Sequence, residues 1–342
     1  MRALRYFAFT TMITVIATSM SLAANRVGSL SEVMMSTDTE TTSYFAAPFA
    51  VNVVNTIGDM NDAIPGDGFC DDGGGFCSLR AAIQEANAAP GIGTIDFNIP
   101  TGCGQVIQPL SALPIITEPV TINGYSQPGA WPNTSATGSN AVICITLSGA
   151  SIGGFTNGLS VNGVNSLIRG LNIIRWTDAG IQVGTGNGTV IEGNFIGSVG
   201  NANRLGITVY ASNVRIGGST LISRNIITRN TRAGIALTEP ASGNVVQNNY
   251  VGLDQFSNPN GNGNSGISIF RSSNNTVGGT TASTRNVISS NGTSIGGGFD
   301  GSGVYIFGDL ISNSPGNTVQ GNYIGTDPSG LIASPNAAHG VK

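Results

Sequence analysis

The stretch that decides the fold is "GNTVQGNYIGTDPSG", residues 316–330. Its centre, Asn322-Tyr323-Ile324-Gly325, nearly repeats "NNYVG" at 248–252 and "GNFIG" at 193–197. Each copy places an Asn and two apolar residues before a Gly. Such recurrence indicates either a catalytic motif used several times or one corner of a repeating scaffold, and the spacing of the copies separates the two.

Two sequence anchors recur along the chain. The first is an Asn followed by two apolar residues, at Asn172, Asn194, Asn225, Asn249, Asn286 and Asn322. The second is a Gly before an alternating strand, such as "GIQV" at 180–183. The interval from Gly to the next Asn spans 14 to 20 residues, and the return interval spans 8 to 18. Turns of roughly 22 to 37 residues, built from short strands with Gly and Asn corners, predict an all-β fold, a parallel β-helix.

The recurring Asn has a physical reason in such a fold. Coils lie on one another at strand spacing, about 4.8 Å, so that like residues stack on like. An inward Asn at a bend can hydrogen-bond its own corner and the Asn of neighbouring coils, which satisfies polar groups that are costly to bury. We expect the six Asn residues to form this ladder, and the apolar residues after them to supply the core. Catalysis would not need six copies.

Residues 48–110 are predicted to form an N-terminal cap. This region opens with an alternating strand at 49–56, and "SLRAAIQEANAAPG" at 78–91 predicts its one helix. Ser78 is the expected N-cap, and Leu79, Ala82, Ile83 and Ala86 share one face at helical spacing. We expect this helix to cover the open apolar end of the first coil.

Two stretches resemble a known family. "GDGFCDDGGGFCSLRAAIQEANA", residues 66–88, is similar to the CSLREA-type N-terminal region of bacterial exported proteins. The later boxes look like the right-handed parallel β-helix repeats that often follow that region. The resemblance implies right-handed repeats over 111–342. One departure is Ala81, where the family more often has Glu; a Glu there would complete a capping box with Ser78, so we expect a weaker helix start.

The N-terminus is typical of a secretory signal peptide, residues 1–24. Arg2 and Arg5 precede an apolar core at 7–16, and small residues follow near Ala23. Residues 25–47 are predicted to be a linker. We expect a secreted or cell-surface protein with no membrane span after signal removal. Nucleic acid is not an expected partner, because Lys342 is the only lysine and the net charge is −4.

The four cysteines favour disulfides in an exported chain. Three pairings are open, and we favour Cys70 with Cys77 and Cys103 with Cys144. Zinc is the weaker alternative, since His339 is the only histidine. No cofactor is expected, with structural calcium in the cap as an alternative to a purely polar loop. Its candidate ligands are Asp59, Asp62, Asp67, Asp71 and Asp72.

Catalytic candidates are sparse in the repeats. Glycoside hydrolysis needs two carboxyl groups about 5 to 9.5 Å apart. Asp254 and Asp327 each follow the Asn of their box by five residues, and the two can share a face of the coil. The alternative for both is a solvated carboxylate at a corner.

Strand alternation predicts a stripe of outward aromatic residues. If Ile207 and Val209 point inward, then the neighbouring Tyr210 points outward. The same register predicts that Phe270, Tyr305 and Phe307 point outward. We interpret these four residues as a candidate surface for glycan rings or a partner. The alternative is that the rings pack under loops of their own coils.

The sequence therefore predicts an exported bacterial surface protein that acts without catalysis in adhesion or glycan binding. Its expected partner is an extracellular glycan or a host or cell-surface molecule. A polysaccharide lyase or glycoside hydrolase of the β-helix type is the alternative, and a purely structural surface protein is a third. Because the chain stops just inside a new strand, we also expect it to be a fragment of a longer protein.

Overall fold

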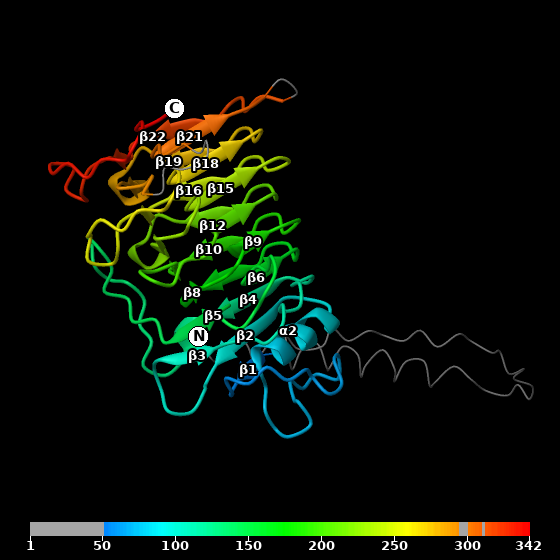
Figure 1. Cartoon of the computed structure of the whole chain (residues 1–342). Helices are drawn as coiled ribbons and strands as arrows, with labels where there is room; N and C mark the ends of the chain where they lie inside the picture. The colour runs from blue at the N-terminus through cyan, green and yellow to red at the C-terminus, as the bar shows by residue number, and fades with distance from the viewer. Residues whose placement is uncertain (1–50, 294–299, 310–311) are drawn as a thin grey trace, which may run out of the picture. The chain divides into compact units, whose positions relative to one another are not determined.

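The computed structural model describes residues 51–293, 300–309 and 312–342. The expected signal peptide (1–24) and linker (25–47) lie outside the described residues. Within these ranges the chain winds in coils that stack from β1 to the last strands (Figure 1).

Three parallel sheets run along the stacked coils of the described chain. Sheet A contains β1 (Val51–Val54), β2 (Gly93–Phe97), β4 (Val120–Asn123), β7 (Leu167–Arg169), β10 (Val190–Glu192), β13 (Arg215–Gly217), β16 (Val245–Gln247), β19 (Thr276–Gly278) and β22 (Thr318–Gln320). Sheet B contains β3 (Gln105–Ile107), β5 (Ile145–Ser148), β8 (Leu171–Ile174), β11 (Phe195–Ile196), β14 (Ile226–Ile227), β17 (Tyr250–Val251), β20 (Val287–Ile288) and β23 (Tyr323–Ile324). Sheet C contains β6 (Leu159–Val161), β9 (Ala179–Val183), β12 (Leu205–Val209), β15 (Ile235–Thr238), β18 (Ile267–Phe270) and β21 (Val304–Phe307).

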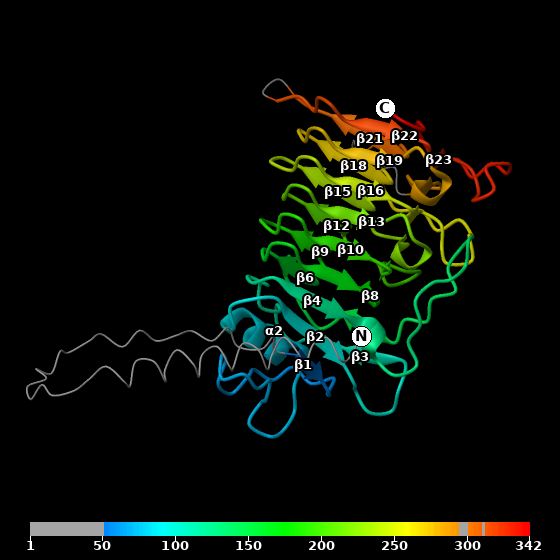
Figure 2. The same ribbon diagram turned by 180° about the vertical axis from the view of Figure 1, so that it is seen from behind.

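Neighbouring strands of each sheet come from successive coils. The chain passes through β7, β8 and β9, one strand in each sheet, and then returns to sheet A as β10. The register is direct, with Leu167 of β7 opposite Val190 of β10 and Ile168 opposite Ile191. This strand order confirms the predicted right-handed parallel β-helix. Figure 2 shows the same stack of strands from behind.

The core is a set of inward columns, one for each sheet. Sheet B contributes Ile173, Ile196, Ile227, Val251 and Ile288, all fully buried and in register. The last four are the second residues after the recurring Asn, whereas Ile173 directly follows Asn172. The first residues after it point to the opposite face, as alternation along a strand requires. Ile226, Tyr250 and Val287 are such first residues, and they are buried in a second apolar cluster outside this column.

The corners use Gly where a side chain would collide with the next coil. Gly217 has φ +81°, a conformation that side-chain-bearing residues rarely adopt, and Gly278 repeats it with φ +92°. A Cβ on Gly217 would clash with the carbonyl of Gln247 and lie 2.7 Å from Oδ1 of Asn249. The corner glycines therefore leave room for the Asn side chains of the following coil.

The predicted helix is present as α2 (Leu79–Ala88). The Ser78 hydroxyl accepts a hydrogen bond from Ala81 N at 3.0 Å and donates one to Met60 O at 2.6 Å. Leu79, Ala82, Ile83 and Ala86 join the same buried cluster as Ile95 of β2. Figure 1 shows α2 beside β1 and β2 at the first coils. Ala81 is itself fully buried, so a longer side chain there has no free space.

The boundary expected at residue 110 does not separate two folds. β2 already pairs with β4 in sheet A, and β3 pairs with β5 in sheet B. Residues 93–107 therefore belong to the coils, because their strands continue the same parallel ladders. Shorter connections of 3₁₀ type occur at η1 (Gly124–Ser126), η2 (Leu221–Ser223) and η3 (Ala282–Thr284).

In the part of the chain that the structure describes, no helix has the length and apolar character needed to span a bilayer.

Candidate functional site

Five of the six predicted ladder residues hydrogen-bond in series along the corner before sheet B. The Asn194 backbone N–H donates to Oδ1 of Asn225 at 2.9 Å, and Nδ2 of Asn225 donates to Oδ1 of Asn249 at 2.8 Å. Nδ2 of Asn249 donates to Asn286 at 3.0 Å, and Nδ2 of Asn286 to Asn322 at 2.9 Å. Partners are 24 to 37 residues apart in sequence.

The prediction is wrong for Asn172. Leu171 holds the ladder position of that coil, because its N–H donates to Oδ1 of Asn194 at 3.0 Å. Asn172 stands opposite Phe195, one residue further along, and points outward. Its Nδ2 instead donates to Thr146 Oγ1 at 3.1 Å.

Two further Asn ladders were not predicted from the sequence. One joins Asn203, Asn230, Asn262, Asn291 and Asn336, and the other joins Asn244, Asn275 and Asn317. A signal was available for both. Most members of the first stand three or four residues before an anchor Gly, and each member of the second directly precedes a strand of sheet A. All three ladders are structural, because their side-chain amides hydrogen-bond to one another and to backbone carbonyls.

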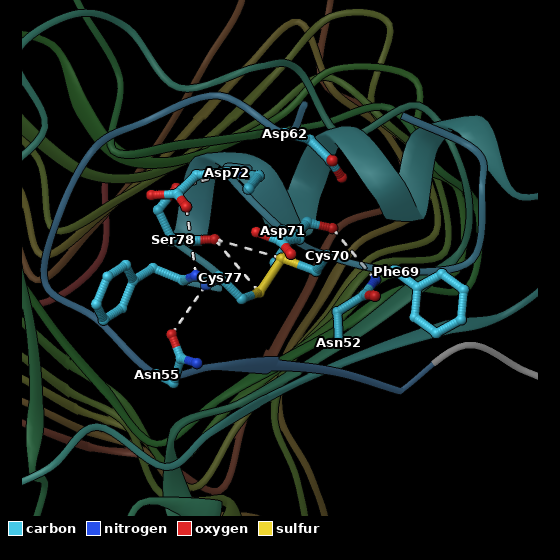
Figure 3. Close-up of a disulfide and its surroundings, with 12 residues drawn as sticks. Asn52, Asn55, Asp62, Phe69, Cys70, Asp71, Asp72, Cys77 and Ser78 are labelled. Atoms are coloured by element: carbon cyan, nitrogen blue, oxygen red, sulfur yellow. Dashed lines mark hydrogen bonds between the residues drawn. A yellow bond between two sulfur atoms is a disulfide. The ribbon is translucent and has the colours of Figure 1, made fainter. Parts of the chain in front are cut away.

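Both predicted disulfides are present. Cys70 is bonded to Cys77, and Cys103 to Cys144. The first closes the Gly-rich loop before α2, where Figure 3 shows it between Asn55 and the start of the helix. Asn55 Oδ1 accepts a hydrogen bond from Cys77 N at 2.8 Å, which ties the loop to the strand β1 region.

The acidic residues of the cap hold their own backbone. Oδ1 of Asp71 accepts from Gly73 N and Gly75 N, both at 2.8 Å, and Asp72 Oδ1 accepts from Gly74 N at 2.8 Å. Asp67 Oδ1 accepts from Phe69 N at 2.9 Å. Figure 3 shows Asp62, Asp71 and Asp72 pointing to separate places.

Asp59 has a different partner, the buried guanidinium of Arg80. The two groups lie 2.9 Å apart, and Asp59 also accepts from Leu110 N at 2.8 Å. Among the described residues no group of three or more His, Cys, Asp or Glu side chains is placed to hold a metal ion. The five candidate calcium ligands are thus distributed over loop contacts, and they do not converge.

Asp62 is the exception within this loop. Its Oδ1 accepts from Ile64 N at 3.2 Å, whereas Oδ2 is buried and has no hydrogen-bond partner. Burial raises the pKa of Asp62, and the nearby carboxylates of Glu85 and Asp67 add to the shift. This carboxyl group therefore resists ionisation.

Asp254 and Asp327 organise two equivalent hairpin loops. Oδ1 of Asp254 accepts from Phe256 N and Asn258 N, and Oδ2 accepts from the amides of Asn258 and Asn260. Four donors occupy the whole acceptor capacity of that carboxylate. Asp327 accepts from the Ser329 hydroxyl and from two backbone N–H groups, and the Ser329 bond leads the effects that lower its pKa. β20 separates β17 from β23, so the two loops lie on different coils.

The outward aromatic residues of sheet C form a closed stack. The rings of Phe270 and Phe307 are 4.7 Å apart between centroids, and those of Tyr305 and Phe307 are 4.4 Å apart. Arg271 covers the Phe270 ring at 4.9 Å, and Lys342 covers Tyr305 at 5.2 Å. The three rings therefore contact one another and two cations. Tyr305 and Phe307 also line a cavity of about 210 Å³ on this sheet.

The two cations are held in place by carboxylates. Lys342 Nζ lies 2.8 Å from Asp300, and Arg271 pairs with Asp309 and, at 3.6 Å, with Glu239. Burial opposes ionisation of Asp300, but hydrogen bonds from Lys342 and Ser302 outweigh it and lower its pKa. Tyr210 follows β12, and β15 lies between β12 and β18, so the predicted stripe is interrupted.

A long connection crosses the outside of sheet B. Residues 131–142, here called the arm, begin with an antiparallel bridge between Trp131 and Val142. Figures 1 and 2 both show this segment reaching from the first coils to the loop after β17. At its tip Gly138 N donates to the Tyr250 hydroxyl at 3.0 Å, and Ser139 N donates to Gln255 O at 2.8 Å.

Arg224 clamps the arm to the coils. Its guanidinium donates to the carbonyls of Ser135, Ala136 and Gly138 at 2.6 to 3.2 Å. It also lies 4.7 Å from the centroid of the Tyr250 ring. Burial lowers the pKa of Arg224 from its ordinary value, while the Tyr250 ring acts in the opposite direction. The arm is therefore a fixed wall on one side of sheet B.

A groove lies on the outer face of sheet B. Its cavity of about 300 Å³ falls within the range of small-molecule sites. Its floor holds Asn172, Phe195 and Ile226, from three successive strands. Ser198 and Val199 line one side, and the loop of residues 254–260, here called the end loop, supplies Asp254, Gln255, Phe256 and Asn260.

The lining combines aromatic faces with neutral polar groups. Phe256 is 73 % exposed, and amide or hydroxyl groups come from Asn172, Gln255, Asn260, Ser198 and Thr228. Among the described residues that line the groove, Asp254 alone carries charge, and its oxygens are already bonded. A signal for this site existed in the outward position of Phe195, the first residue after a ladder Asn.

No family model matches this sequence, and no curated protein matches it. Two solved structures from Azotobacter vinelandii are similar. The A-module of the mannuronan C-5 epimerase AlgE4 has 15 % identity and a TM-score of 0.27, covering 84 % of this chain and 98 % of its own. The A-module of the mannuronan C-5 epimerase AlgE6 has 14 % identity and a TM-score of 0.25, covering 83 % and 98 %. The fold is assigned from the strand order alone, because structural similarity at this level supports no further argument.

Proposed function

We propose that this chain is an exported binding protein whose groove on sheet B takes neutral glycans, in the setting of surface adhesion. The observation that carries the proposal is the lining of the groove. A sugar ring offers an apolar C–H face to an aromatic side chain and hydroxyl groups to amides, and this groove provides both partners within one concave site. The two disulfides agree with an oxidising compartment.

The charge of the lining supports a neutral ligand. An acidic polysaccharide needs cations to pair with its carboxylates, and the described lining contains neither Lys nor Arg. The Asp254 carboxylate would repel such a chain. The lining of the groove therefore does not support binding of uronate polymers.

The sheet C aromatic residues fit the proposal less well. Their ring faces are covered by Arg271, by Lys342 and by one another. A sugar ring that replaced Arg271 on Phe270 would have to displace a cation that also has carboxylate partners. The exposed ring of Phe256 carries no such cover.

The test measures retention on immobilised neutral and acidic polysaccharides. We expect the full chain to bind a neutral polysaccharide, and Phe256→Ala to lose about 1–2 kcal/mol of binding free energy, roughly 5- to 30-fold in Kd. Phe69→Ala is the matched control, because Phe69 is equally exposed at 73 % but lies in the disulfide loop. Retention that is unchanged in Phe256→Ala, or binding confined to acidic polymers, contradicts the proposal.

A further inference from the structure

The outward column that forms the groove floor runs on beyond the groove toward β3. In this column of sheet B, Val106, Thr146, Asn172, Phe195 and Ile226 stand opposite one another in register. Five strands at about 4.8 Å give this column a length of roughly 19 Å. A linear ligand that follows the column would lie across successive coils.

One end of the column is closed. The end loop crosses it after β17, fastened by an antiparallel bridge between Leu253 and Pro259 and by the four hydrogen bonds to Asp254. The arm holds the same loop from outside through Ser139 N and Gln255 O. Beyond this point, Tyr250, Leu253 and Val287 are buried in one apolar cluster with Ile226. A chain cannot continue through that cluster.

The other end of the column is open and more polar. Val106 on β3 is 45 % exposed, and Thr146 and Asn172 are half-buried and bonded to each other at 3.1 Å. Side chains at this end therefore remain accessible to water or to a ligand. The groove is blind at the end loop and open toward β3.

From this asymmetry we infer that the site recognises the end of a glycan chain. The inference rests on the proposed function, since it takes a neutral glycan as the occupant. The terminal sugar sits against Phe195 and Phe256, where the Gln255 amide and the Ser198 hydroxyl line the groove and meet its hydroxyl groups. The following sugars leave over Asn172 and Thr146 toward β3. A position in the middle of a long polymer does not fit, because its continuation would collide with the end loop.

The experiment measures binding capacity against chain length at constant mass of one neutral polysaccharide. Polymer that binds the full chain is hydrolysed to a tenfold shorter mean length and immobilised again. We expect the amount of bound protein per milligram of glycan to rise about tenfold, in proportion to the number of chain ends. Capacity that stays constant with mass overturns end recognition but leaves glycan binding intact. Absence of any retention contradicts the proposed function instead.

A loop variant supplies an independent readout. Asp254→Ala removes the acceptors that fasten the end loop, so that the closed end should open and capacity should follow mass rather than ends. Asp327→Ala is the matched control, since Asp327 organises the equivalent loop after β23 and lies outside the groove lining. Circular dichroism checks that both variants fold. Dependence on chain ends that persists unchanged in folded Asp254→Ala shows that this loop does not close the site.

Discussion

The ladder along sheet B makes a quantitative prediction at its midpoint, Asn249, which is fully buried. Its Nδ2 donates to Ile216 O, Gln247 O and Asn286 Oδ1 at 2.9 to 3.0 Å. Its Oδ1 accepts from Asn225 at 2.8 Å. The substitution Asn249→Ala removes four side-chain hydrogen bonds and leaves polar groups of two neighbouring coils without a partner.

The expected cost follows from these four bonds. Because Nδ2 has two hydrogens for its three acceptors, the contacts amount to about three full hydrogen bonds. At about 1 kcal/mol net for each, the loss is about 3 kcal/mol, which orphaned buried groups raise and an entering water molecule lowers. We therefore expect the free energy of unfolding to fall by about 3–5 kcal/mol. This is a large part of the stability of an ordinary domain.

The matched control is Asn172→Ala. Asn172 and Asn249 each stand directly before an apolar pair in the same sequence motif. Asn172, however, is half-buried, and its side chain makes one hydrogen bond, to Thr146. We expect Asn172→Ala to cost about 1 kcal/mol or less. The difference between the variants isolates the ladder from the general effect of removing an Asn amide.

Urea unfolding followed by circular dichroism measures both variants against the unsubstituted chain. Stacked-coil proteins can unfold in parts, so amide hydrogen exchange in β14, β17 and β20 should localise the loss around position 249. Equal destabilisation by the two substitutions would refute the assignment of the amide column as a stabilising element.

Three other predictions concern the arm, the cap and the disulfides. Arg224→Met removes the donors to three arm carbonyls, so limited proteolysis should cut residues 133–140 faster. The control is Arg285→Met, because Arg285 lies over Tyr323 at 4.1 Å in the equivalent position. We expect cleavage in Arg224→Met to be at least several-fold faster than in this control. Because burial raises the pKa of Asp62, its ionisation costs stability as pH rises through the folded-state pKa. Asp62→Asn should therefore raise the free energy of unfolding at neutral pH, and the gain should vanish at about pH 3, with Asp72→Asn as control. Removing the Cys103–Cys144 pair, 41 residues apart, should cost about 4 kcal/mol, against about 2 kcal/mol for the Cys70–Cys77 pair, 7 apart, as measured by urea unfolding of the two double Ser variants.

The repeat fold was predictable because residues that stack in space occupy equivalent places in successive sequence repeats. Residues such as Ile196 and Ile227 are adjacent in space because they occupy the same place in successive coils. Similar boxes therefore indicate a common column. The helix α2 was predictable for a different reason, since its N-cap and apolar face are local features.

Asn172 shows where that reasoning fails. Its box reads Asn-Ile-Ile, as does the box at 225–227 two coils further on, yet its coil is displaced by one residue and Leu171 takes the ladder position. Corner lengths vary from coil to coil, so a sequence box fixes the register only to within one residue. In a strand, a displacement of one residue exchanges the inner and outer faces.

The groove was not predictable from the repeats, because it depends on segments that interrupt them. The contact between Gly138 and Tyr250 joins residues that are 112 positions apart, and the arm that makes it occurs once in the described chain. Loop residues carry no periodic signal from which their place could be inferred. The position of Phe256 likewise follows from the hydrogen bonds of Asp254 and not from strand alternation.

The contrast between the two aromatic surfaces depends on which ring faces are free, and not on how many aromatic residues gather. Sheet C brings three rings together, and the Arg and Lys at the two ends of the stack turn it into a brace between coils. Sheet B offers fewer rings, but Phe256 stands exposed beside the Gln255 amide and a concave floor. A sugar gains free energy only from surface that is not already satisfied by the protein itself. The groove meets that condition at Phe256 and Gln255, whereas the stack meets it only where Tyr305 and Phe307 line their own cavity.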